Sequence, residues 1–282
     1  MMQRTAVVTG GNGGIGFETA KVLARRGWRV IITGRDEAKL SRAVTAIHNE
    51  SGSDADYRIG DFASFASVRD LAAALLTEPR IDVLVNNAGV SLSRRILTVD
   101  GNEMVLQVNH LAPFLLTHLL LDRIKASAPA RIVNVSSRSY RFVRDPGFED
   151  FQFARSFSAI KSYTRTKFYN ILFTRELARR LNSASVMVNA VHPGSIVSQI
   201  GMDGDYHGIM RLLMKTRQPL KSPLRFGSKV TVFAATSTEI ESVTGEYFSV
   251  HLKAERLTRA ALDDDAARRL WDLSCSLVGL SE

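Results

Sequence analysis

A glycine-rich loop between a short apolar run and an amphipathic stretch limits the fold of this chain more than any other feature. The segment TAVVTGGNGGIGFETAKVLARRG, which starts at Thr5, places Gly10, Gly14 and Gly16 at that junction. Glycine is needed where a backbone turns tightly, approaches a pyrophosphate or packs closely on a helix, and the helix N-terminus offers N–H groups to the phosphate. Because strand and helix signals flank the loop, it predicts a dinucleotide-binding site.

Short apolar runs alternate with longer stretches of helical periodicity along the whole chain, which is typical of a parallel sheet with crossover helices. We expect an α/β fold, a doubly wound seven-stranded parallel sheet, in a single Rossmann domain spanning 1–282. The expected strands are 5–9, 29–33, 57–59, 82–86, 131–136, 186–192 and 246–250, and the expected helices are 15–26, 37–49, 65–77, 101–121, 159–181, 226–236 and 264–278. The irregular stretch 196–223 is interpreted as a substrate lid, with a loosely packed surface excursion as the alternative.

Composition excludes several classes of protein. The 37 basic and 28 acidic residues give a net charge of +9, but the basic residues are scattered, which favours anionic small molecules over nucleic acid. The single cysteine, Cys275, excludes an internal disulfide framework, and no histidine has a partner at metal-ligand spacing, so we expect no metal. No signal peptide is visible, and the apolar block 111–121 is far shorter than the ~20 residues that cross a bilayer, so a cytoplasmic protein without a membrane partner is expected.

The residues after the second expected strand bear on the choice of cofactor. The segment reads ITGRDE, with Arg35 and Asp36 where an adenosine ribose would lie in such a sheet. A carboxylate there suits an unphosphorylated ribose, whereas a guanidinium attracts a ribose phosphate. Arg35 therefore favours NADP(H), with NAD(H) as the alternative. Both residues could instead cap the next helix, and Asp36 is a suitable N-cap.

A tyrosine and a lysine stand four residues apart in YTRTK, at Tyr163 and Lys167. On a helix this spacing places both on one face, where the ammonium can act on the phenol. A free tyrosine ionises near pH ~10, so an acid or base that works near neutrality needs an adjacent cation. Taken alone, the pair is also common on solvated helix faces.

Three further motifs accompany this pair: VNNAGV at 85–90, VNH at 108–110 and IVNVSS at 132–137. Two of them end expected strands, where ligands bind in sheets of this kind. With TGGNGGIG and YTRTK, they resemble the short-chain dehydrogenase/reductase superfamily. The stretches RELARRL, VNAVHPGSI, TGEYFS and ARRLWDLS, and the long insert between serine and tyrosine, resemble its retinol dehydrogenase-like branch, which includes light-dependent protochlorophyllide reductases.

The resemblance implies a catalytic role for four residues. Tyr163 would donate a proton in carbonyl reduction and accept one in alcohol oxidation, while Lys167 would lower the pKa of Tyr163 and hold the nicotinamide ribose. Ser137, preferred over Ser136, would bind the substrate oxygen. Asn109 would hold its helix and a water that links Lys167 to solvent. Each could also be an ordinary structural residue, with the serines in a strand-end turn and Asn109 in a helix-interior hydrogen bond.

The resemblance also implies the cofactor contacts. Asp61 would bind the adenine amino group, or could cap a helix, and Asn87, Ala88 and Gly89 would lie along the adenine ribose. Pro193, Gly194, Ile196 and Ser198 would approach the nicotinamide carboxamide. Gly13 replaces a hydroxyl residue common in the family, which weakens the argument for NADP(H). The expected cofactor-binding residues are Gly10, Asn12, Gly14, Ile15, Gly16, Arg35, Asp61, Phe62, Asn87, Ala88, Gly89, Tyr163, Lys167, Pro193, Gly194, Ile196 and Ser198.

These features together predict an NADP(H)-preferring oxidoreductase that interconverts a bulky lipophilic ketone or aldehyde and its alcohol. Three alternatives remain: a non-catalytic NADP(H)-binding sensor or scaffold, a sugar-nucleotide epimerase or dehydratase, and, on net charge alone, a nucleic-acid-binding protein. The expected partner is a small carbonyl or alcohol. The resemblance further implies a homodimer through helices 101–121 and 159–181, or a homotetramer.

Overall fold

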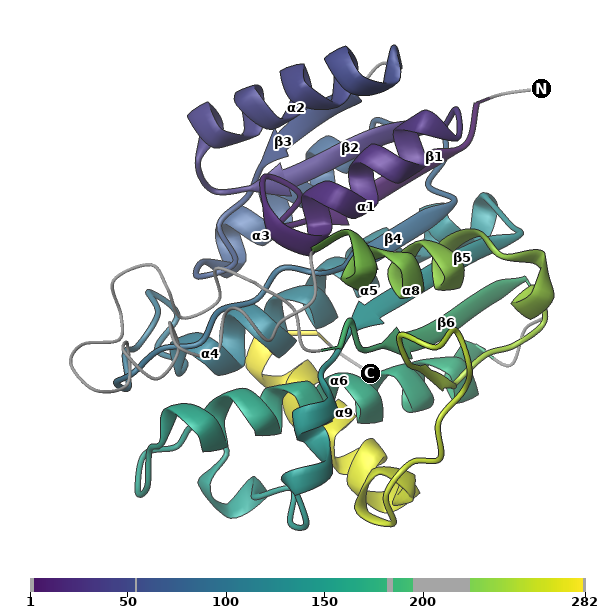
Figure 1. Ribbon diagram of the computed structural model, residues 1–282. Helices are drawn as coiled ribbons and strands as arrows, with labels where there is room; N and C mark the ends of the chain where they lie inside the picture. The colour runs from purple at the N-terminus through teal and green to yellow at the C-terminus, as the bar shows by residue number, and fades with distance from the viewer. Residues whose placement is uncertain (1–2, 54, 182–184, 195–223, 281–282) are drawn as a thin grey trace, which may run out of the picture.

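The computed structural model describes residues 3–53, 55–181, 185–194 and 224–280 (Figure 1). Its sheet has the strand order β3-β2-β1-β4-β5-β6-β7, and every neighbouring pair is parallel, which confirms the predicted doubly wound seven-stranded α/β sheet. The strands are β1 (Thr5–Thr9), β2 (Arg29–Gly34), β3 (Ala55–Ile59), β4 (Val83–Asn86), β5 (Ala130–Val135), β6 (Val186–Val191) and β7 (Tyr247–Phe248). The order reverses between β1 and β4, where ligands bind in folds of this type.

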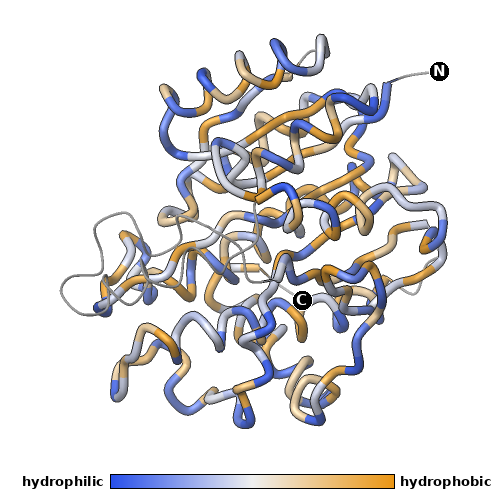
Figure 2. Tube along the Cα trace, in the orientation of Figure 1, coloured by the Kyte–Doolittle hydropathy of each residue, from blue (hydrophilic) through white to orange (hydrophobic). Residues whose placement is uncertain are grey.

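Helices cover both faces of the sheet because successive strand residues point to opposite sides. On β1, Ala6 and Val8 pack beneath α1 (Gly14–Arg25), α2 (Glu37–Ser51) and α8 (Leu224–Thr236). Val7 faces the other layer, formed by α3 (Phe65–Leu75), α5 (Ala112–Ala126), α6 (Ala159–Leu181) and α9 (Asp264–Val278). Figure 2 shows the apolar residues gathered along the strands and on the inner sides of the helices. Both layers therefore bury apolar side chains on one central sheet.

One continuous helix runs from Met104 to Ala126, in three parts. It begins as α4 (Met104–Leu106), passes through a π-helical turn, η1 (Gln107–Leu111), and continues as α5. The helix predicted over 101–121 therefore begins three residues later and ends five residues later than expected. Its 23 residues are long and apolar enough to cross a membrane by length and composition. However, 78% of its apolar window is buried inside the fold, which is what a core helix shows.

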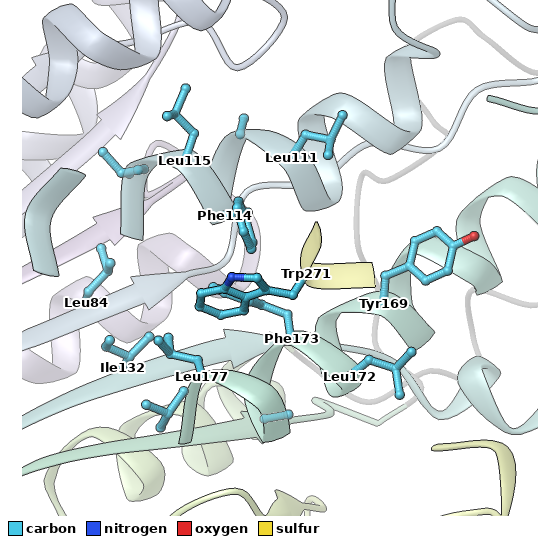
Figure 3. Close-up of a cluster of buried hydrophobic side chains, with 14 of the residues drawn as sticks. Leu84, Leu111, Phe114, Leu115, Ile132, Tyr169, Leu172, Phe173, Leu177 and Trp271 are labelled. Atoms are coloured by element: carbon cyan, nitrogen blue, oxygen red, sulfur yellow. The ribbon is translucent and has the colours of Figure 1, made fainter. Parts of the chain in front are cut away.

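The outer faces of α5 and α6 are covered by later parts of the chain. Trp271 of α9 packs edge-on against Phe114 of α5 at 5.1 Å between ring centres and lies 6.2 Å from Phe173 of α6 (Figure 3). Cys275 is buried in the same helix. The insert between β5 and α6 contains short 3-10 turns at Arg138–Phe142 and Phe148–Asp150, and Tyr169 of α6 donates a 2.7 Å hydrogen bond to Pro146 in it.

This covering bears on the expected dimer. Nearly every α6 residue from Ser162 to Ala178 is buried, and the first part of α5 is buried on all sides. Pairing of two subunits through the buried parts of these helices would require displacing α9 and the insert. The dimer stays a prediction, and the surface proposed for it is occupied within the chain.

Candidate active site

Tyr163 and Lys167 lie one turn apart on α6, facing the carboxyl end of β5. The Lys167 ammonium is 5.7 Å from the centre of the Tyr163 ring and donates a 3.1 Å hydrogen bond to the carbonyl of Val135, the last residue of β5. Lys167 is 3% exposed, and desolvation by this burial lowers its pKa to about 8. The predicted shared helix face is therefore present, with the cation buried beside the phenol.

Asn109 connects this helix to the loop after β4. Its side-chain amide donates to the Val90 carbonyl at 2.9 Å and to the Thr166 hydroxyl at 3.1 Å, while its oxygen accepts from the Val90 amide at 2.7 Å. Thr166 donates in turn to the carbonyl of Tyr163 at 2.9 Å. Asn109 sits in the π-helical turn, an irregularity that often marks functional sites.

Asn109 and Lys167 meet at Gly89. A Cβ atom added to this glycine would lie 3.2 Å from the Asn109 oxygen and 3.4 Å from the Lys167 ammonium. A side chain here would crowd the Asn109 oxygen and touch the Lys167 ammonium, so glycine keeps the space open. The structure therefore brings together motifs from the ends of β4 and β5, the π turn and α6.

The two neighbouring serines after β5 have different environments. Ser136 is 2% exposed and donates a 2.6 Å hydrogen bond to the carbonyl of Lys167, so its hydroxyl ties α6 to the sheet. Ser137 is half-buried, and its hydroxyl accepts from the amide and the hydroxyl of Ser139 at 3.2 and 3.0 Å. The Ser137 hydroxyl proton stays available for another acceptor, which agrees with the preference for Ser137 over Ser136.

The glycine loop and the β4 loop pack directly on each other. Gly10 has a φ of +64°, and a Cβ there would lie 3.0 Å from Ala88 Cα; one on Gly16 would lie 2.5 Å from both the Gly10 oxygen and the Asn87 amide nitrogen. The Asn87 side chain donates to the Thr9 carbonyl at 2.8 Å. The side chain of Asn87 is therefore occupied in holding the loop.

Thr9 was not singled out from the sequence, although it holds these loops together. Its hydroxyl accepts hydrogen bonds from the amides of Asn87 and Ala88, each 3.0 Å away. The sequence indicated only that Thr9 is the last residue of the expected strand 5–9, where ligand-binding loops begin in such sheets. Two other predicted residues of the glycine loop can be placed. Ile15 is buried in α1. Asn12 lies against the end of β2, since a Cβ added to Gly34 would lie 2.9 Å from its side-chain oxygen.

Beyond β2, a cationic hollow of about 230 Å³ lies between the glycine loop and α2. It is lined by Asn12, Phe17, Lys39, Arg42, Ala43 and Ala46.

Arg35 is exposed, with no ion pair to any residue within the described ranges. Asp36 caps α2, as expected, by accepting from the Lys39 amide at 3.0 Å, and this bond lowers the Asp36 pKa. Lys39 and Arg42, three residues apart on α2, were missed by the sequence reasoning.

The proposed capping role of Asp61 is wrong. The N-cap of α3 is Ser64, whose hydroxyl accepts from the Ser67 amide, whereas Asp61 accepts from the Ala63 amide at 3.0 Å and shapes the loop before the helix. The side chain of Phe62 is 6% exposed and belongs to the core, so only its backbone can face a ligand.

The segment after β6 is described only to Gly194. This glycine has a φ of +79°, and its amide donates to His192 Nδ1 at 3.2 Å. A Cβ on Gly194 would come within 2.8 Å of Val250 Cγ1, so the close approach requires glycine. Pro193 is half-buried beside it. Ile196, Ser198 and the expected lid at 196–223 lie outside the described residues.

In the described ranges, no three histidine, cysteine, aspartate or glutamate side chains are grouped closely enough to hold a metal ion. His110 and His118 lie in the long core helix, where burial lowers the pKa of both. The absence of a metal stays an expectation.

Comparisons with known proteins agree with this geometry. A model of the short chain dehydrogenase family matches residues 4–205. The chain is 40% identical to human retinol dehydrogenase 14, covering 99% of this chain and 88% of that protein, and 39% identical to human retinol dehydrogenase 12, covering 98% and 87%.

Solved structures show the same fold. An uncharacterized protein from Mycobacterium paratuberculosis superposes with a TM-score of 0.78 at 31% identity, covering 99% of this chain and 94% of that one. A protein from Beutenbergia cavernae, whose structure holds NADP at low occupancy, superposes with a TM-score of 0.69 at 27% identity, covering 88% and 94%. The chain therefore belongs to the short-chain dehydrogenase/reductase superfamily, whose members use NAD(P)(H) to act on CH–OH groups, and is retinol dehydrogenase-like.

Proposed function

We propose that this protein is an NADP(H)-preferring oxidoreductase that interconverts a bulky lipophilic ketone or aldehyde and its alcohol, with Tyr163 as the acid and base. The observation that supports this most directly is that the buried Lys167 ammonium lies 5.7 Å from the centre of the Tyr163 ring, and that this ammonium and the Asn109 oxygen both lie close to Gly89. A buried cation beside a phenol at a strand end is what proton transfer to a carbonyl oxygen requires.

The glycine loop fits a pyrophosphate. Helix α1 has no side-chain cap on its N-terminal amides and no acidic residue in its first turn, so the positive end of the helix dipole is open to an anion. Gly13 and Gly14 have nothing within 4 Å of an added Cβ, so the loop's outer side is clear for a ligand. Asn87, Ala88 and Gly89 would line the ribose side through their backbone.

The charges beyond β2 support NADP(H) over NAD(H). Lys39 and Arg42 line the Asn12 hollow, where the ribose phosphate would lie, and the exposed Arg35 directly follows β2. Asp36, the one carboxylate adjacent to Arg35 that could bind a ribose hydroxyl, is engaged with the Lys39 amide. A phosphate would therefore meet guanidinium and ammonium groups.

The chemistry assigned to the chain is proton transfer and orientation. When bound, the cofactor supplies or accepts the hydride. The Tyr163 hydroxyl gives its proton to the carbonyl oxygen in reduction, and the Tyr163 phenolate takes the alcohol proton in oxidation. Lys167 stabilises the phenolate by its charge, and the Ser137 hydroxyl donates to the same substrate oxygen. Asn109 fixes the β4 loop against α6.

A lipophilic substrate is supported by the relatives whose names state retinol, and by the apolar residues of 196–223. That stretch contains Ile200, Met202, Tyr206, Met210, Leu212, Leu213 and Met214, among which flexible methionines suit a large, irregular ligand. These residues would form the lid over the carbonyl.

The test is oxidation of NADPH and of NADH by the purified protein with retinoid, steroidal, aromatic and quinone carbonyls. We expect turnover with a bulky carbonyl and a preference for NADPH. Tyr163→Phe should abolish turnover and keep NADPH affinity within about twofold, because the phenol acts in the transition state. Tight NADPH binding without turnover on any carbonyl would instead favour a sensor, and activity retained in Tyr163→Phe would refute the assignment of the acid.

A further inference from the structure

A fully buried carboxylate begins the helix that carries Asn109. Glu103 is 0% exposed, and its two oxygens accept from the amides of Val105 and Leu106 at 3.0 and 2.8 Å. The other buried carboxylates of the described chain, Glu78, Asp82 and Glu176, each pair with arginine. Within the same ranges, Glu103 has no ion-pair partner within 4.0 Å, so its bonds to the helix and to Ser162 hold it in place.

The same carboxylate reaches the helix that carries Tyr163. Ser162 is 0% exposed, and its hydroxyl donates to Glu103 Oε2 at 3.3 Å. It directly precedes Tyr163 in the first turn of α6. Another connection between the two helices, from Asn109 to Thr166, lies three residues after Tyr163. The two connections thus stand on either side of Tyr163.

The insert before α6 joins this arrangement through Gln152. Its side-chain oxygen accepts from the Glu103 amide at 2.8 Å, and its side-chain nitrogen donates to Asn102 at 2.7 Å. Its carbonyl accepts from Arg95 at 3.0 Å. Burial raises the pKa of Glu103, although the two helix amides, Ser162 and the charge of Arg95 act in the opposite direction. Three segments therefore meet at Glu103: the helix start and α6 at its carboxyl group, and the insert at its backbone amide.

We infer that Glu103 and Ser162 are a positioning pair, which sets the first turn of α6 so that the Tyr163 hydroxyl lies correctly relative to Lys167 and Asn109. The inference rests on the proposed role of Tyr163. Neither residue is placed in contact with the reacting atoms. Loss of the pair lets the start of α6 shift, and a shift of well under 1 Å is enough to slow proton transfer.

Ser162→Ala is the sharpest test, because it removes the connection and leaves the cap on the helix amides intact. We expect kcat to fall about tenfold, with KM and the NADPH dissociation constant within about twofold, since only the transition state loses alignment. The apparent pKa of the Tyr163 phenol, measured by ultraviolet titration against the Tyr163→Phe variant, should rise by about half a unit as the phenol moves from Lys167.

Thr174→Val is the matched control. Thr174 is 1% exposed on the same helix, and its hydroxyl also bridges two elements by donating to Asn170 and accepting from Asn134. It lies three turns from Tyr163, so its removal should lower the melting temperature and leave kcat and the phenol titration unchanged. Ser162→Ala behaving in the same way would overturn the inference.

Glu103→Gln provides the second variant. It should reproduce the fall in kcat. The double variant with Ser162→Ala should have a kcat no lower than that of the more severe single variant, because both substitutions remove the same connection. If the two substitutions lowered kcat independently, so that their effects were fully additive, Glu103 and Ser162 would not act as a pair. If the protein reduces no carbonyl, the proposed function fails, but the phenol titration of the Ser162→Ala variant still decides whether the pair positions Tyr163.

Discussion

The ammonium of Lys167 donates to the carbonyl of Val135, 3.1 Å away, and thereby joins α6 to the end of β5. The same side chain is 3% exposed, so its ammonium is buried away from water and its pKa is lowered. The hydrogen bond holds the two elements together, but the buried charge that serves the chemistry lowers the stability of the folded protein.

We expect Lys167→Met to lose at least about 100-fold in turnover and, at pH 7, to gain about 2 kcal/mol in the free energy of unfolding. The folded pKa of about 8 lies below the unfolded value, so the unfolded chain binds more protons between pH 8 and about 10.5 and stability rises with pH across that window. Urea unfolding at pH 7 and pH 9.5 measures this, and the gain should shrink at the higher pH. Lys229→Met, at an exposed position, is the control. A variant less stable than wild type at pH 7 would contradict the expectation.

The adjacent serines should separate chemistry from structure. Ser137→Ala is expected to lower kcat about 100-fold with little change in stability, because its hydroxyl binds the transition-state oxygen. Ser136→Ala should cost about 1–2 kcal/mol in unfolding free energy, because the buried Lys167 carbonyl loses its donor, while kcat falls much less. Steady-state kinetics and thermal unfolding of both variants give the comparison, and the reverse order of kcat losses would be evidence for Ser136 as the substrate ligand.

Cofactor choice should depend on Arg35. In Arg35→Ala, we expect the NADPH dissociation constant to rise about 10-fold or more and the NADH constant to change less than about twofold, because only the former carries the ribose phosphate. Lys39→Ala should have a smaller effect in the same direction. Arg25→Ala, at the far end of α1, controls for net charge. Fluorescence titration measures these constants, and equal losses for both cofactors would argue against a phosphate at this position.

A buried histidine should make the fold sensitive to acid. His110 donates to the Ser274 hydroxyl at 2.8 Å, since Ser274 itself donates to the Leu270 carbonyl, and burial lowers the His110 pKa to about 3. The unfolded chain therefore binds one more proton here as the pH falls below about 6.5, and stability is lost between pH 6.5 and pH 3. Between pH 7.5 and pH 5.5, the free energy of unfolding of the His110→Asn variant should fall by about 1 kcal/mol less than that of the wild type. Urea unfolding at the two pH values measures this difference. An equal slope in both proteins would mean that His110 titrates normally.

The regular elements could be predicted where the pattern was strong and local. Strand β1 and helix α6 have the predicted limits, 5–9 and 159–181, because an apolar run bounded by glycine and a long amphipathic stretch leave little choice. Strand β7 has two residues rather than the predicted five, since its length depends on pairing with β6. The π turn around Asn109 could not be predicted, because its apolar spacing is that of an ordinary helix.

The site shows the same division. Tyr163, Lys167, Asn109 and Ser137 could be proposed from the sequence because each stands in a short motif. Glu103 and Ser162 are 59 residues apart and carry no motif, so only the folded chain reveals their contact. Likewise, the amphipathic pattern at 264–278 predicted α9, but the pattern does not state that this helix would cover α5 and α6.

That covering helix affects how the protein is made. Trp271 and its neighbours in α9 fill the surface of α5 and α6 from a position near the end of the sequence (Figure 3). During synthesis, the apolar faces of both helices stay uncovered until α9 leaves the ribosome. The nascent chain therefore exposes these apolar surfaces from the synthesis of α6 until α9 has been made, and the helix with Tyr163 acquires its final packing only then.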